Sequence, residues 1–312
     1  MCLTRRVAAR IVNLMRRKVF AAAVGIMWSV PAAAQDVPGR DLLFFPLGTA
    51  AEAPPLAAQS SGGLWNPAMI ELRPGARARI GVATIDSPAD QGVTSRLIAF
   101  EMLAPRQLTV GISLARASVD DLVRTETDPQ SLGTIPYATT VASLAVARQT
   151  RRHVAAGLAL RYRHGEMDGL RRSALGLDGG IVIDELTSQD IRVGVSSFLW
   201  RPGSGPGEFA SLLAAADVRV MGTEDRKGTR IGYGISYTSG LATEQYGMAS
   251  LRNGAMELRA GTSRTSIYDV ATWRFRLGLG LYYARYGLGV AREDSGAGLG
   301  PTYQFTLSST IE

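Results

Sequence analysis

Cysteine, histidine and lysine are scarce in this sequence, and their scarcity excludes several kinds of site. The single cysteine, Cys2, precedes an apolar run near the N-terminus, so the remainder can form no disulfide framework and no thiolate metal site. Only two histidines are present, His153 and His164, whereas a metal site needs three or four converging ligands. We expect no metal and no other cofactor. The sequence also lacks a G-x-S-x-G nucleophile elbow, and we expect no enzyme activity.

A transmembrane helix is not expected near the N-terminus, because the apolar run there is short. Residues 19–30 give 12 apolar positions, where a spanning helix needs about 20. Six Lys and Arg precede the run without any acid, and Ala32-Ala33-Ala34 follows it. This order is typical of a secretory signal peptide. We predict cleavage after Ala34, and Met15 stays open as an alternative start.

Net charge is also small once that signal is removed. The whole sequence has 34 basic and 27 acidic residues, and removing the six basic residues of 1–34 leaves 28 against 27. The only lysine after residue 34 is Lys227. A balanced chain gives little support to a nucleic-acid partner, and we expect none.

Short segments of alternating hydrophobicity fill most of the chain after residue 76. Residues 108–116 place Leu, Val, Ile and Leu on one face, and Thr, Gly, Ser and Ala on the other. Residues 153–163 and 273–283 repeat this pattern, with Gly, Ala and Arg opposite the apolar face. Period-2 alternation indicates β-strands. Segments of about 9–14 residues exceed the usual globular strand and suit a membrane strand.

We therefore predict an all-β chain that forms a single antiparallel transmembrane β-barrel of about 14 strands. An even count with short turns on the periplasmic side is typical of outer-membrane barrels. A soluble periplasmic β-protein stays open as an alternative. We divide the chain into a signal peptide (1–34), an N-terminal hatch or plug (35–75) and the barrel (76–312). The expected strands are roughly 77–86, 93–103, 107–117, 139–149, 152–164, 171–184, 190–200, 209–221, 229–238, 244–252, 255–263, 270–283, 284–292 and 300–310.

Five short motifs, in order along the chain, resemble a known group of barrels. They are Gly62–Ala68 (GGLWNPA), Arg151–Leu158 (RRHVAAGL), Ala174–Gly180 (ALGLDGG), Glu257–Gly261 (ELRAG) and Gly300–Phe305 (GPTYQF). Together they resemble PorV/PorQ-like outer-membrane proteins of the FadL-type, long-chain fatty-acid transporter-like superfamily. Two departures stand out. The small-residue run before the Asn-Pro-Ala motif is AAQSSGG instead of GGAGVA, and the last residue is Glu312 instead of an aromatic.

The resemblance implies an outer-membrane location, a hatch formed by the N-terminal segment, and contact with outer-membrane lipid. It leaves two functions open. FadL-type members transport hydrophobic or amphipathic small molecules, and this is the function we expect first. A PorV-like barrel would instead be a non-transporting accessory whose partner is a secretion-system or surface protein.

Two sets of residues are candidates for function. The hatch motif is Trp65, Asn66, Pro67 and Ala68, where Asn and Pro favour a tight bend and a role in gating is the alternative. Ten charged residues share the predicted inward face: Arg161, Asp178, Arg192, Asp217, Arg219, Arg230, Glu257, Arg259, Arg274 and Arg276. They predict either a structural ion-pair network or a path for a substrate with an anionic head group.

Overall fold

The described part of the protein covers most of the predicted barrel and part of the segment before it. The computed structural model describes residues 37–44, 47–57, 61, 63–70, 72, 75–87, 92–120, 122–124, 133–151, 153–185, 190–200, 211–224, 227–238, 243–267, 270–295 and 300–312. The predicted signal peptide and its cleavage site after Ala34 lie outside these residues and stay predictions.

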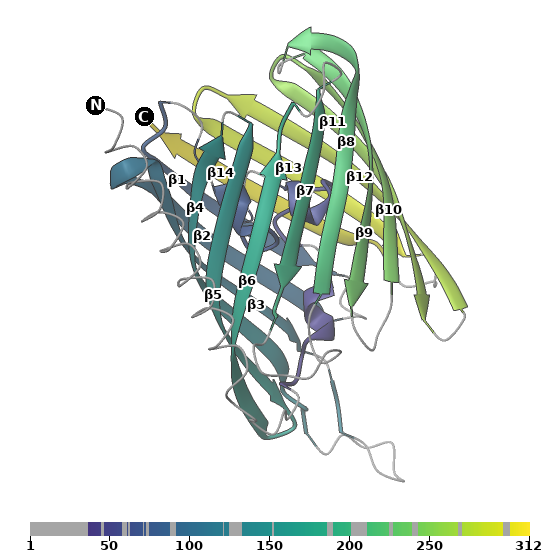
Figure 1. Ribbon diagram of the computed structural model, residues 1–312. Coiled ribbons are helices and arrows are strands. Elements are labelled where there is room, and N and C mark those ends of the chain that lie inside the picture. Colours follow the sequence, from purple (N-terminus) through teal and green to yellow (C-terminus); the bar gives the residue numbers. More distant parts are fainter. Residues whose placement is uncertain are drawn as a thin grey trace.

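Fourteen antiparallel strands close into one barrel (Figure 1). Each strand pairs with its neighbours in sequence, and β1 pairs with β14 to complete the ring. The predicted all-β barrel is therefore confirmed, and each expected strand lies within a few residues of an observed one. The bounds are β1 Ala78–Asp86, β2 Val93–Ala104, β3 Leu108–Val119, β4 Tyr137–Arg151, β5 Val154–Met167, β6 Leu170–Ile183, β7 Ile191–Phe198, β8 Ser211–Glu224, β9 Lys227–Thr238, β10 Thr243–Asn253, β11 Met256–Ile267, β12 Val270–Tyr283, β13 Tyr286–Ser295 and β14 Thr302–Ile311.

Alternation of side chains decides which face of each strand turns outward. On β3, Ile112 and Leu114 are about half exposed, while Ser113 and Ala115 are buried. The same alternation recurs around the barrel, so large apolar side chains cover the outside and small or charged ones fill the inside. An inverted pattern of this kind suits a barrel with lipid outside. Among the described residues, no helix is long and apolar enough to span a membrane.

Both ends of the described barrel lie on the same rim, where β1 begins and β14 ends (Figure 1). Turns on this rim include Pro105–Gln107 and the two-residue turn Gly254–Ala255. The latter was expected at Asn253-Gly254 and lies one residue later, with Gly254 at a φ of 62°. β3 ends and β4 begins at the opposite rim, so the longest connection, 120–136, joins strand ends there, as the short-turn rule for outer-membrane barrels requires.

The described residues between 37 and 70, here called the N-terminal segment, pack inside the barrel (Figure 1). The segment contains three short 3-10 helices: η1 (Asp41–Phe44), η2 (Pro54–Leu56) and η3 (Pro67–Ile70). η3 contacts β4, β5 and β6, and η2 contacts β7 and β8. A buried apolar cluster joins the segment to the strands, with Leu64 and Trp65 on one side and Val141 and Phe198 on the other. The packed core of this protein thus lies within its own barrel.

Candidate functional site

The Trp-Asn-Pro-Ala motif is a buried bend that ties the N-terminal segment together. The Asn66 amide donates to the carbonyl of Pro55 at 2.8 Å, and its Oδ1 accepts from the amide of Ala68 at 3.0 Å. The Trp65 indole donates to the carbonyl of Leu47 at 2.8 Å. Pro67 opens η3 directly after this bend. The contacts account for the motif as a bend, and its role in gating is a prediction.

Glycines on the inner wall let the backbone of the segment approach the strands closely. A Cβ at Gly157 of β5 would lie 2.5 Å from the carbonyl of Pro67. One at Gly194 of β7 would lie 2.6 Å from the carbonyl of Pro55. A Cβ at Gly180 would collide with the side chain of Asn66. These strands therefore need glycine where they meet the segment.

A fully buried ion pair joins the segment to the wall. Arg161 of β5 pairs with Asp178 of β6, and both side chains have no solvent exposure. Arg161 also donates to Ser143 at 2.9 Å and to the carbonyl of Gly63 in the segment at 3.1 Å. Each of the three guanidinium nitrogens of Arg161 has a hydrogen-bond partner, so the two charges can be accommodated in this interior.

Asp178 also closes a gap between two strands. β6 and β7 pair only over residues 180–183 and 193–196. Beyond this short ladder, the Asp178 carboxylate accepts from the amides of Leu199 at 3.0 Å and Trp200 at 2.9 Å. A side chain thus satisfies backbone donors that would otherwise need a partner strand.

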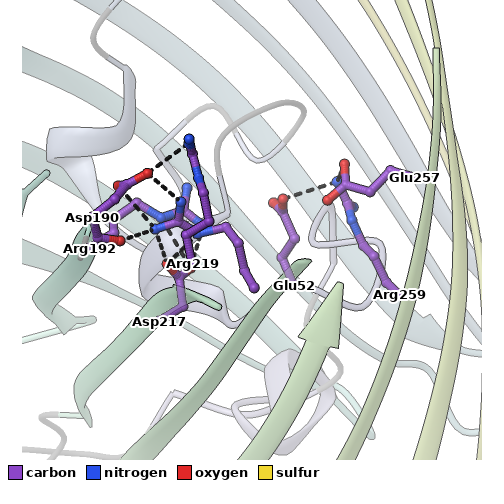
Figure 2. A network of polar contacts seen from close by, with 8 residues as sticks. Glu52, Asp190, Arg192, Asp217, Arg219, Glu257 and Arg259 are labelled. Atoms are coloured by element: carbon purple, nitrogen blue, oxygen red, sulfur yellow. Dashed lines mark hydrogen bonds and ion pairs between the residues drawn. The ribbon is translucent and has the colours of Figure 1, made fainter. Parts of the chain in front are cut away.

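A second cluster of charges lines the inner wall formed by β7, β8 and β9, near the rim that carries both termini. Figure 2 shows its side chains from close by. Asp217 of β8 accepts from Arg192 of β7 and Arg230 of β9, both at 2.6 Å. Asp190 accepts from Arg219 at 2.7 Å and from Arg230 at 3.2 Å. The three guanidiniums therefore share two carboxylates across three neighbouring strands.

The N-terminal segment supplies a carboxylate to the next cluster. Arg259 of β11 lies 3.0 Å from Glu52 of the segment and 3.0 Å from Glu257 (Figure 2). Arg259 also donates to the carbonyl of Ala50 at 3.0 Å. The Tyr282 hydroxyl donates to Glu257 at 2.8 Å. Arg259 is therefore, like Arg161, a charged side chain of the barrel that holds the segment.

A further cluster lies along β10, β12 and β13. Arg274 and Arg276 of β12 pair with Glu244 of β10 and Glu293 of β13. Side chains of all four are largely buried.

All ten charged candidates from the sequence lie inside the barrel, and each has an ion-pair partner. They form several separate clusters and not one continuous path. The sequence interpretation missed four partners: Glu52, Asp190, Glu244 and Glu293. Strand parity could have identified Glu244 and Glu293, whereas Glu52 lies in a segment without periodicity.

A cavity of about 450 Å³ opens between the N-terminal segment and β7–β12. Its lining is mixed: Leu56 and Met248 are apolar, while most of the rest is charged or polar. Five arginines and six carboxylates line it: Arg192, Arg219, Arg230, Arg252, Arg259, Glu52, Asp184, Glu185, Asp190, Asp217 and Glu257. The guanidinium of Arg252 stacks over the Tyr282 ring, 4.3 Å from its centre. No group of His, Cys, Asp and Glu within the described ranges could hold a metal ion.

Among the solved structures that resemble the protein in fold are a hydrocarbon channel and a toluene transporter. The monoaromatic hydrocarbon channel CymD aligns with a TM-score of 0.57 and 11% sequence identity, over 85% of this chain and 98% of its own. The Pseudomonas putida toluene transporter TodX aligns with a TM-score of 0.54 and 10% identity, over 85% of this chain and 97% of its own. The sequence matches no protein-family description and no curated protein. At these identities the likeness establishes the barrel fold.

Proposed function

We propose that this protein is an outer-membrane barrel that transports hydrophobic or amphipathic small molecules, with the N-terminal segment as its hatch. The observation that carries the proposal is the segment itself, which fills the barrel and leaves a cavity beside it at one rim. The fold likeness to a hydrocarbon channel and a toluene transporter supports a FadL-type barrel more than a PorV/PorQ-type one.

Chemistry of the cavity favours the amphipathic substrates within this class. Leu56 and Met248 offer apolar contacts, while the guanidinium of Arg252 lies over the Tyr282 ring. Among the described residues Arg252 makes no ion pair within 4 Å, so its donors can meet a polar head group. A pure hydrocarbon would displace water from this charged lining and offer it no hydrogen bonds in return.

A non-transporting accessory barrel is the second candidate, and one observation favours it. The segment is held by charged groups of the lumen, with Glu52 on Arg259 and the carbonyl of Gly63 on Arg161. A hatch secured in this way suits a permanently plugged barrel that serves as a docking platform. The two candidates differ in whether the segment must move.

A reversible lock on the segment tests this difference. Ala53, just before η2, packs with Ala215 of β8 in a buried cluster that also contains Leu56. Since the sequence has no cysteine after Cys2, the variant Ala53→Cys/Ala215→Cys introduces the only pair of cysteines there. In proteoliposomes, we expect flux of a medium-chain fatty acid to be lost on oxidation and restored by a reductant.

The two single-cysteine variants serve as controls and should transport in both redox conditions. Equal flux in the locked and unlocked states would show that the segment is not a hatch. Absence of flux in every state, in a barrel that is folded and inserted, would favour the accessory function.

A further inference from the structure

Two arginines lie side by side on the outer surface of the barrel. Arg96 of β2 and Arg116 of β3 are direct cross-strand partners, and both are exposed. Residues paired in this way have Cβ atoms about 4.5–5.5 Å apart, within reach of a shared ligand. Thr84 of β1 and Thr140 of β4 flank the pair in the same register.

Neither arginine is neutralised within the part of the chain that the structure describes. Within these described residues, no ion pair or hydrogen bond involves either guanidinium, although Asp86 ends the neighbouring strand β1 and Asp120 directly follows β3. Like charges directly opposite each other destabilise a sheet, so this arrangement calls for an anion from outside. Arg292 of β13 differs, because this outward-facing arginine pairs with Asp294 at 2.8 Å.

The arginine pair marks the transition from apolar to polar surface. Two residues toward the middle of the barrel, Ile98 and Leu114 are about half exposed to the outside. Two residues the other way, the hydroxyls of Thr94 and Ser118 lie 3.1 Å apart. Lipid head groups occupy such a transition. Arg96 lies near the start of β2 and Arg116 near the end of β3, so the pair lies toward the rim opposite both termini, which is the cell-surface rim if the short turns face the periplasm.

We propose that Arg96 and Arg116 together bind the phosphate of a lipid head group in the outer leaflet. Guanidinium groups match phosphate oxygens in a fork geometry, and one phosphate between them would remove their mutual repulsion. The two threonine hydroxyls can donate to the same group. This inference rests on the outer-membrane location proposed above but not on transport.

Lipid retention by the folded barrel tests the site. Native mass spectrometry of detergent-solubilised protein would be titrated with lipid A and with the same lipid after removal of its phosphates. We expect the dephosphorylated lipid to bind weakly, and Arg96→Gln/Arg116→Gln to bind lipid A at least about tenfold more weakly than the parent, because charge-assisted hydrogen bonds are lost. Arg292→Gln is the matched control and should bind as the parent does.

Three results would overturn the proposal. The first is a loss of lipid A binding in Arg292→Gln as large as that in the double variant. The second is binding of the dephosphorylated lipid as tight as that of lipid A. The third is displacement of lipid A by inorganic phosphate alone. The last would assign the site to the free anion. The lipid-binding measurement uses folded protein in detergent, so a failed transport assay would not affect it. A failure of the protein to insert into vesicles would count against the outer-membrane location, and not against the lipid site.

Discussion

Strands β4–β7 meet the N-terminal segment through glycines and apolar side chains, whereas β8–β12 face it across ion pairs and an open cavity. On the first wall, the segment approaches Gly157 and Gly180 so closely that a Cβ would collide with it. On the second, Arg259 reaches across to Glu52, and a cavity of about 450 Å³ remains. Close packing is thus the main contact at the first wall, and ion pairs beside a cavity are the main contact at the second, although Arg161 also reaches the segment from the first wall and Ala215 of β8 packs against it.

This difference indicates how the segment could be fixed and released. Close packing tolerates little displacement, because dispersion contacts are lost within a fraction of an ångström. Ion pairs beside a polar cavity can exchange partners with water or a ligand at smaller cost. We infer that the β4–β7 wall anchors the segment and that the β8–β12 wall is where it yields first.

The largest effect is expected from breaking the buried ion pair on the anchoring wall. Arg161→Met leaves Asp178 charged, buried and without its guanidinium. Loss of one partner of a buried pair costs about 3–5 kcal/mol, so the free energy of unfolding should fall by that amount. Urea titration of the barrel in lipid vesicles, followed by tryptophan fluorescence, measures it.

A matched exposed pair and a double variant complete this test. Arg171 pairs with Glu166 at 2.7 Å but is largely exposed, so Arg171→Met should cost less than about 1 kcal/mol. Arg161→Met/Asp178→Asn should recover part of the loss, because no unpaired charge remains. Equal costs for the Arg161 and Arg171 variants would contradict the anchoring role.

The contrast between the walls was only partly predictable from sequence. Strand parity places Arg161 and Asp178 on the inward face, and the structure finds them there. Successive side chains of a strand point to opposite faces of the sheet, so the alternating pattern of the sequence predicts the barrel and its fourteen strands. The ion pair of Arg259 with Glu52 could not be predicted from the sequence pattern. Glu52 lies in a segment without periodicity, and the path of that segment depends on tertiary packing.

A smaller effect is expected from adding volume where the segment touches the anchoring wall. A Cβ at Gly180 would collide with Asn66, so Gly180→Val should displace the bend at a cost of about 1–3 kcal/mol. Gly179→Val on the same strand is the control, since its Cβ would meet only Leu158, at 3.7 Å. In planar bilayers, the first variant should show higher conductance than the second. Indistinguishable conductance would mean that this wall does not set the position of the segment.

The smallest effect is expected on the yielding wall, where Glu52 holds Arg259. The Glu52 side chain is 19% exposed, and Glu52→Gln keeps its shape while removing the charge. Arg259 retains Glu257 and the carbonyl of Ala50, so the free energy of unfolding should fall by only about 1 kcal/mol.

If the β8–β12 wall yields first, Glu52→Gln should nevertheless increase fatty-acid flux in proteoliposomes above that of the parent protein, although it hardly changes the stability of the barrel. Glu166→Gln, which removes the charged partner of the exposed Arg171, is the control and should leave flux unchanged. A Glu52→Gln barrel that loses stability without gaining flux would place the moving contact elsewhere, because releasing this ion pair would then not be a step in opening.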